Sequence, residues 1–261
     1  MSSIVTDQGI VHYEVYGRGE PVVLLHGWLG SWGYWLETME ALGRHYRLYA
    51  LDFWGFGDSG KRRERYLVSD FVDLVDQFMD CLGIVRAPVV GHSMGGTVAL
   101  SLALSRPQRV RKVVVVGSPV VGDSLHLFLR LAGRPWIAYT VWHMPTILRW
   151  GIRLFSPQVT REWRKWYEMQ IADLSRTTLE AFFSSIGSLR CTDLRPRLPE
   201  LHTPVMSING VGDNVVNPNQ ATLIARWVPG ARIEMMPSSR HFPMLDEPEA
   251  FNERLYSFLE N

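Results

Sequence analysis

Apolar and polar positions along the chain follow two alternating patterns. Short apolar runs, which predict strands, lie at residues 10–16, 21–25, 46–52, 87–91, 112–116, 205–208 and 232–236. Apolar residues at helical spacing, which predict helices, lie at residues 34–42, 69–82, 94–104, 219–227 and 249–259. In the helix at 69–82 we expect Ser69 to be the N-cap and Cys81 to be a buried thiol. Strands that alternate with helices predict an α/β fold with a mostly parallel central sheet flanked by helices.

The interval between Ser118 and Thr203 interrupts this alternation. It contains no clear strand pattern, and helical spacing dominates at residues 163–171 and 178–189. Five of the ten tryptophans lie in this interval, namely Trp136, Trp142, Trp150, Trp163 and Trp166. We therefore predict a core formed by residues 1–121 and 201–261, with a helical cap inserted at residues 122–200.

The composition restricts the function more than the fold. With 261 residues, 46% of them hydrophobic, the chain can bury one large core, and a net charge of +1 argues against nucleic-acid binding. Two cysteines are too few for a disulfide framework or a cysteine-rich metal cluster. No secretion signal or membrane-spanning apolar run is recognised, so we expect a cytoplasmic protein. We expect the charged run at residues 61–65 to be a solvated loop.

Ser93 lies in the stretch Gly91-His92-Ser93-Met94-Gly95, between a predicted strand and a predicted helix. A serine at such a junction can present its hydroxyl as a nucleophile, and the flanking glycines let the strand and the helix approach closely. The same glycines are compatible with close packing alone, without any chemistry. This stretch alone does not distinguish the two interpretations, so further residues of the chain are needed.

Two places are expected to supply backbone N–H groups for a developing oxyanion. One is Met94, which follows the candidate nucleophile at the start of a predicted helix. The other is Trp28, in the glycine turn that follows the strand at 21–25. We expect the neighbouring His26 to stabilise its own turn rather than to act as a base.

A candidate acid and a candidate base follow in the order that a serine triad requires. Asp213 comes after the strand at 205–208 and His241 after the strand at 232–236, and parallel sheets build their sites at such strand ends. His241 would take the proton of Ser93, and Asp213 would orient the imidazole and stabilise its charged form. Taken singly, each is more easily read as a surface residue, but the three together favour a triad.

The stretch Gly55-Phe56-Gly57-Asp58-Ser59-Gly60 matches the spacing of a dinucleotide-binding fingerprint. No helix follows it directly, and Asp80 lies within the helix at 69–82 rather than after a second strand. We therefore interpret it as a structural turn and expect no nucleotide cofactor.

These motifs together resemble those of the α/β-hydrolase superfamily, over nearly the whole chain. They are HGW at 26–28, DFWGFGDS at 52–59, GHSMGG at 91–96, GVGD at 210–213 and RHFP at 240–243. HGW with GHSMGG looks most like small bacterial carboxylesterases and the related cofactor-free haloperoxidase-like enzymes. The resemblance implies a cap inserted after the sixth core strand. It also leaves Asp123 as a second candidate for the acid of the triad.

From these residues we predict a serine hydrolase that cleaves carboxylic esters of small to medium lipophilic substrates through an acyl-enzyme, with no metal or organic cofactor. Carbon–carbon bond hydrolases, lactonases and perhydrolases use the same triad and stay open as alternatives. His92 and Phe242 stand where carbon–carbon hydrolases usually carry asparagine and tryptophan, which makes the carbon–carbon alternative less favoured without excluding it. A signalling or binding module that keeps the hydrolase fold is the alternative outside enzymes.

Residues 125–155 are rich in large apolar side chains, with arginines interspersed. Such a segment can pack its apolar side on the core. It can also form an apolar lid over an acyl pocket and make a weak contact with a lipid interface. The sequence is compatible with both interpretations.

Overall fold

The computed structural model describes residues 2–7, 9–61, 65–132 and 134–261, and its centre is an eight-stranded sheet in the order β1-β2-β4-β3-β5-β6-β7-β8. The strands are β1 (Ser2–Thr6), β2 (Gly9–Gly17), β3 (Glu20–Leu25), β4 (Tyr46–Leu51), β5 (Ala87–His92), β6 (Val110–Val116), β7 (Val205–Gly210) and β8 (Arg232–Met236). From β4 to β8 neighbouring strands run parallel, whereas β1 and β2 form an antiparallel edge. The predicted mostly parallel sheet is confirmed.

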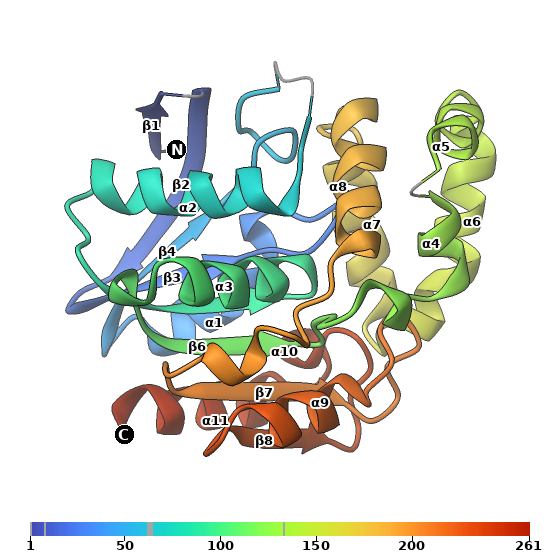
Figure 1. Ribbon diagram of the computed structural model, residues 1–261. Coiled ribbons are helices and arrows are strands. Elements are labelled where there is room, and N and C mark those ends of the chain that lie inside the picture. Colours follow the sequence, from blue (N-terminus) through green and yellow to red (C-terminus); the bar gives the residue numbers. More distant parts are fainter. Residues whose placement is uncertain (1, 8, 62–64, 133) are drawn as a thin grey trace.

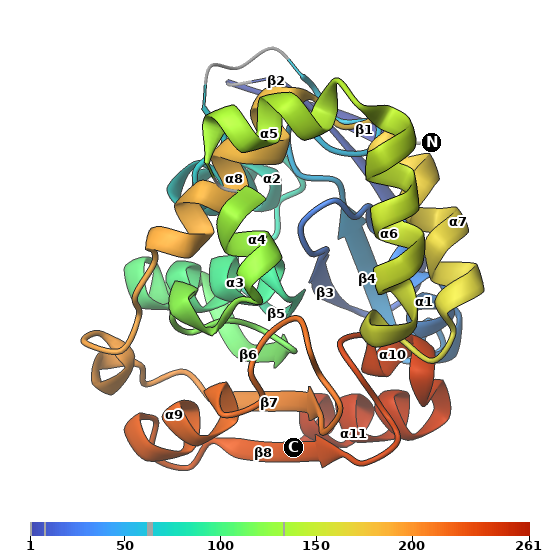
Figure 2. The same ribbon diagram turned by 90° about the vertical axis from the view of Figure 1, so that its right-hand side faces the viewer.

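Helices cover both faces of this sheet. Figures 1 and 2 show α2 and α3 on one face and α1 and α11 on the other. The helices of this core are α1 (Leu36–Leu42), α2 (Val68–Cys81), α3 (Met94–Ser105), α9 (Gln220–Trp227), α10 (Pro243–Asp246) and α11 (Pro248–Glu260). Because the inner strands β5 and β7 are covered on both sides, all of their residues are buried.

The chain between β6 and β7 forms further helices, which lie beside the sheet in Figure 1 and face the viewer in Figure 2. They are α4 (Leu127–Ala132), α5 (Pro135–Trp142), α6 (Pro145–Val159), α7 (Trp163–Leu174) and α8 (Leu179–Cys191). The helical insertion follows the sixth strand of the sheet. We call α4–α8 the cap, and the division at residues 121 and 200 stays a prediction.

Two expectations about α2 are wrong. The helix begins at Val68 with Leu67 as its N-cap, because the Asp70 carboxylate accepts a hydrogen bond of 2.9 Å from the Leu67 N–H. Ser69 therefore lies inside the first turn. Cys81 is exposed, because the last residue of α2 falls beside its apolar stripe rather than on it.

Strand β1 is missing from the prediction, since its first four residues alternate between half-buried and exposed positions, only Thr6 is buried, and the segment carries little apolar signal. In the charged run at residues 61–65, Lys61 and Arg65 are exposed, and residues 62–64 lie outside the described residues. None of the described helices is long and apolar enough to span a membrane.

Candidate active site

Ser93 occupies a strained turn between β5 and α3. Its backbone has φ +51° and ψ −117°, a conformation that a residue with a side chain adopts only when its surroundings impose it. A side chain at Gly91 would collide with the backbone of Gly95, and one at Gly95 would collide with the backbone of Leu25. The glycines therefore permit close packing and the strained serine at once, and the strain favours the nucleophile interpretation.

His241 and Asp213 lie side by side after β8 and β7. The His241 Nδ1–H donates to Asp213 Oδ2 at 2.8 Å, and both side chains are buried. The other carboxylate oxygen, Oδ1, accepts from the backbone N–H groups of Val215 (2.8 Å) and Val216 (3.0 Å). The carboxylate is thus fixed in one orientation. Asp123, the second candidate acid, is exposed in the 3-10 turn Gly122–Ser124.

The end of β6 borders all three residues. The Ser93 N–H donates to the Val116 carbonyl at 2.8 Å. At the next residue, Gly117 with φ +53°, a Cβ atom would lie 3.2 Å from His241 Nδ1 and 3.3 Å from Asp213 Oδ2. Among the described residues the Ser93 hydroxyl makes no hydrogen bond, so the structure brings Ser93 and His241 to one place without joining them. Such contacts are often long before substrate binds.

Two backbone N–H groups lie beside Ser93 as candidate donors to an oxyanion. Within the described part of the chain, neither the Trp28 N–H nor the Met94 N–H donates a hydrogen bond. Met94 is the first residue of α3, where helical geometry offers its N–H no partner. Gly27, next to Trp28, lies so close that a Cβ there would be 3.2 Å from the Ser93 Cβ. The loop after β3 therefore adjoins the candidate nucleophile.

A cap residue that no local pattern of the sequence indicates holds this loop in place. Leu29 has φ +57°, the one positive value besides that of Ser93 among the described residues other than glycine. Its carbonyl accepts a hydrogen bond of 2.7 Å from the buried Gln170 Nε2 in α7. The Tyr34 hydroxyl donates to Gln170 Oε1 at 3.4 Å. The cap thus stabilises the strained turn next to Trp28.

The neighbouring histidines are uncharged structural groups. His26 accepts from the Phe53 N–H (2.9 Å) and donates through Nδ1 to the Gly27 carbonyl (2.7 Å), which agrees with the structural role expected for it. Burial lowers its pKa. His92 donates through Nε2 to the His241 carbonyl at 2.9 Å, and burial and the adjacent His241 hold the His92 pKa well below its usual range. His92 therefore supports the loop that carries His241.

A buried carboxyl group, that of Asp173 in α7, lies behind the same loop. It contacts the hydroxyls of Ser31 and Tyr34, and its Oδ2 has no hydrogen-bond partner among the described residues. Burial raises the pKa of Asp173 to about 7. The sequence offers no means of distinguishing this carboxyl group from the many exposed ones.

The glycine-rich stretch at 55–60 forms a turn around Asp52. Asp52 Oδ1 accepts from the Trp32 N–H (2.8 Å), and Oδ2 accepts from the Asp58 N–H (3.0 Å) and from His12 Nδ1 (2.8 Å). Burial acts to raise the Asp52 pKa, but the His12 hydrogen bond and the other donors lower it overall. One atom each of His12, Asp52 and Asp58 that could bind a metal ion lies within 4.8 Å of the others. Since both Asp52 oxygens are already used, this cluster stabilises the turn and loop.

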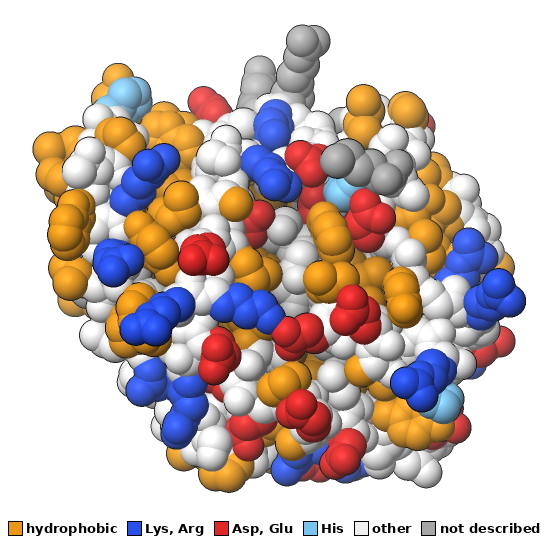
Figure 3. Space-filling model, turned by 180° about the vertical axis from the view of Figure 1, so that it is seen from behind, with side chains coloured by type: hydrophobic (Ala, Val, Ile, Leu, Met, Phe, Trp, Pro, Cys, Tyr) orange, Lys and Arg blue, Asp and Glu red, His pale blue; other side chains and the backbone are white. Residues whose placement is uncertain are grey.

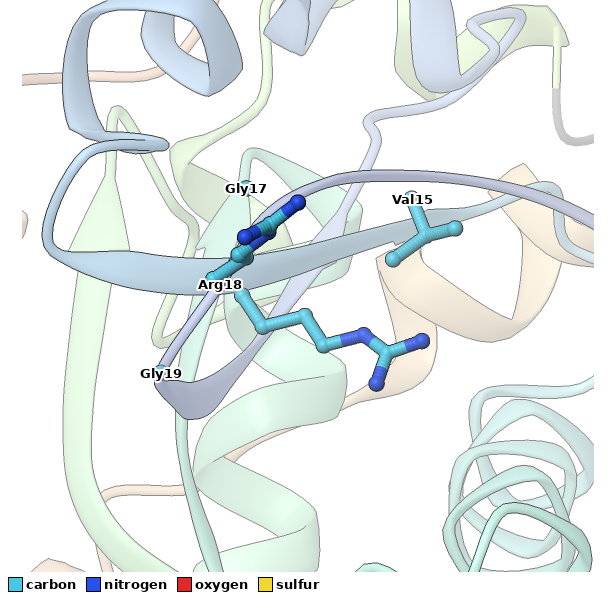
Figure 4. A pocket seen from close by; sticks show the side chains of 5 residues that line it. Val15, Gly17, Arg18 and Gly19 are labelled. Atoms are coloured by element: carbon cyan, nitrogen blue, oxygen red, sulfur yellow. The ribbon is translucent and has the colours of Figure 1, made fainter.

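A hollow with a volume of about 360 Å³ lies elsewhere on the protein. Figure 4 shows it between Val15, Gly17, Arg18 and Gly19, with Arg47 completing its lining. Gly17 pairs with Arg47 near the start of β4, whereas Ser93, Asp213 and His241 follow the ends of parallel strands. The hollow is therefore separate from the candidate active site.

The chain is similar in sequence and in fold to known hydrolases. A family model described as the alpha/beta hydrolase fold matches residues 20–162, more than half of the chain. The chain is 28% identical to a pimeloyl-[acyl-carrier protein] methyl ester esterase of Nitrosomonas europaea, covering 92% of this chain and 96% of that protein. It is 30% identical to a putative carbamate hydrolase RutD of Caulobacter vibrioides, covering 96% of this chain and 95% of that protein. The solved enol-lactonase of Burkholderia xenovorans LB400 superposes with a TM-score of 0.85 at 21% identity, over the full length of both chains.

Proposed function

The chain belongs to the α/β-hydrolase fold family, and on this basis we propose that it is a serine hydrolase that cleaves carboxylic esters through an acyl-enzyme. The observation that carries the proposal is the 2.8 Å hydrogen bond between buried His241 and Asp213, at the same edge of the sheet as the strained Ser93. A hydrolase activity agrees with the names of the esterase and the carbamate hydrolase that the chain resembles.

In the proposed mechanism the Ser93 oxygen attacks the ester carbonyl carbon while His241 Nε2 takes the hydroxyl proton. The N–H groups of Trp28 and Met94 hold the oxyanion that forms. His241 then gives the proton to the leaving alcohol, and the acyl group stays on Ser93. Water repeats the sequence: His241 removes its proton, the acid is released, and Ser93 regains its hydrogen. Asp213 stabilises the charged imidazole in both halves.

Aromatic side chains beside Trp28 support a lipophilic substrate. The Trp28 indole N–H donates to the Phe182 carbonyl at 2.9 Å, and the Trp28 and Phe182 rings lie 4.8 Å apart. Trp142 of α5 packs against Phe182 at 5.5 Å. We propose that these three side chains line the acyl side of the site. A series of p-nitrophenyl esters from acetate to octanoate tests this, and activity that disappears before octanoate contradicts it.

The catalytic assignment is tested first with Ser93→Ala. We expect ester hydrolysis to fall by about 10³-fold or more, and a fluorophosphonate probe to label wild type but not the variant. Normal turnover in Ser93→Ala would overturn the mechanism. Wild type that neither reacts with the probe nor cleaves any ester would indicate a binding module instead.

The acid is tested with a matched pair. Asp213→Asn should lose most activity because it leaves the imidazole in the wrong tautomer, whereas exposed Asp123→Asn should keep nearly all of it. The reverse result would transfer the role of acid to Asp123. Parallel assays on a lactone, a carbamate and a carbon–carbon substrate would separate the alternatives that share this triad.

A further inference from the structure

We propose that the outer side of α5 and α6 binds the surface of an anionic phospholipid bilayer. We call this side the outer cap surface. It consists of the exposed residues Arg134, Trp136, Tyr139, Met144, Ile147, Arg149, Trp150, Arg153 and Leu154. Figure 3 shows hydrophobic and basic side chains together on the left side of the molecule, where the cap lies in that view. The proposal goes beyond the hydrolase function and does not depend on the triad.

Exposed apolar side chains are concentrated in this part of the chain. Of the fifteen exposed large hydrophobic residues in the described ranges, seven lie between Leu127 and Leu154. The others are scattered over the rest of the chain. Trp136 is 68% exposed and Trp150 is 61% exposed. Single exposed apolar residues are ordinary, but a group of this kind marks an interaction surface.

The spacing within α6 shows two apolar faces. Ile152 and Phe155, spaced three apart, turn inward and pack against the buried core cluster, and Leu148, four residues before Ile152, is half-buried. Ile147, Trp150 and Leu154, spaced three and four apart, form a second stripe that is exposed. A surface helix whose outer side faces only water carries polar residues on that side. The second stripe therefore has no partner among the described residues of the chain.

The charge of the segment identifies the partner. Residues 124–161 contain five arginines and no aspartate, glutamate or lysine. Arg134, Arg149 and Arg153 are exposed, and no ion pair of the described residues involves them. Arg153 instead lies over the rings of Trp163 (5.9 Å) and Tyr167 (5.6 Å). Positive charge on one side only is complementary to a surface of anionic head groups.

The same charge argues against a second copy as the partner. A symmetric dimer through the outer cap surface would place this surface against itself and bring arginines of both copies together. A bilayer satisfies both components, because aromatic and aliphatic side chains enter the head-group region while arginines remain at the phosphates. Tryptophan and tyrosine are the residue types that fit such a boundary.

The test is co-sedimentation with vesicles. We expect wild type to bind vesicles of equal parts phosphatidylglycerol and phosphatidylcholine, more weakly at high salt, and to bind pure phosphatidylcholine poorly. The triple variant Trp136→Gln, Trp150→Gln and Leu154→Gln should bind at least about tenfold more weakly. Arg149→Gln and Arg153→Gln should each reduce binding to the anionic vesicles about fivefold.

Matched controls separate this effect from misfolding. Val85→Gln with Trp227→Gln removes exposed apolar groups far from the cap in sequence and should bind vesicles like wild type. The triple variant should keep the wild-type thermal midpoint, and Ser93→Ala should keep vesicle binding. Wild type that does not bind the anionic vesicles at low salt would overturn the proposal, as would equal binding by the triple variant. A wild-type dimer in sedimentation velocity that the triple variant lacks would assign the surface to self-association instead.

Discussion

The two halves of the cap differ in what their helices contact. Helices α7 and α8 are hydrogen-bonded to the core: Gln170 reaches the Leu29 carbonyl, and Ser184 accepts a hydrogen bond from the Tyr66 N–H. Helices α5 and α6 instead present Trp136 and Trp150 to solvent. The difference lies in what the polar residues meet: Gln170 of α7 and Ser184 of α8 bond to backbone groups of the core, whereas Arg134 before α5 and Arg149 and Arg153 of α6 form an exposed basic surface.

This comparison shows that apolar content does not reveal which way a helix faces. A buried glutamine or serine in an apolar helix indicates a side that meets another backbone, since buried polar groups need partners. Arginines without acidic neighbours indicate a side that meets something outside the chain. The core contacts of the inner half, α7 and α8, should therefore control stability and catalysis, and the outer cap surface of the outer half, α5 and α6, should affect neither.

The largest effect is expected for Phe182→Ala, which removes a ring that packs against Trp28 from the inner half. Phe182 is only 3% exposed, and truncating a buried phenylalanine lowers the free energy of unfolding by about 3–5 kcal/mol. Ile147→Ala, in the outer half, should change it by less than about 0.5 kcal/mol. Urea denaturation measures both, and equal losses would abolish the distinction between the halves.

Asp173→Asn should alter how stability depends on pH. Because the folded pKa of about 7 lies above the ordinary value of 3.8, the unfolded chain releases this proton first, and stability falls as pH rises between the two values. At pH 8 the variant should be more stable than wild type by up to about 4 kcal/mol, with this gain absent near pH 4. Glu168→Gln, exposed on the same helix, should not change the profile. If the free energy of unfolding of wild type and of Asp173→Asn depended on pH in the same way, the raised pKa of the Asp173 carboxyl would be contradicted.

Gln170→Leu should lower kcat about 10- to 100-fold with little change in KM, because the Leu29 carbonyl loses its donor and the turn that carries Trp28 relaxes. Gln158→Leu applies the same change to an exposed residue of α6 and serves as the control. Steady-state kinetics on a short soluble ester distinguishes a positioning role from a purely structural one. A loss of stability with unchanged kcat would show that Gln170 only supports the fold.

The smallest effect is expected for Trp150→Gln. Its side chain is 61% exposed, so the free energy of unfolding, measured by thermal melting, should change by no more than about 0.5 kcal/mol. The rate of hydrolysis of a soluble ester should not change. A large loss in either measurement would mean that Trp150 packs inward and that the halves are not distinct.

The sequence was sufficient where local patterns and strand ends determine the structure. The alternating periods predicted the sheet and its helices, and residues placed after three strands lie at one edge of it, as in the Asp213–His241 pair. Contacts between distant segments were not predictable. Gln170 and Leu29 are 141 residues apart, and nothing in either local sequence indicates the other. Ser69 failed as an N-cap for a local reason, because Asp70, its neighbour in the chain, supplies the capping oxygen to Leu67.

The main-chain link between the cap and the His241 loop limits how this fold can be modified. The His241 N–H donates to the Val159 carbonyl at the end of α6, at 2.9 Å, while Gln170 donates to Leu29 on the other side of the site. A cap transplanted from another hydrolase would have to provide an acceptor at the first point and a donor at the second. Exchange of caps should thus succeed only where the graft carries both contacts, whatever pocket it brings with it.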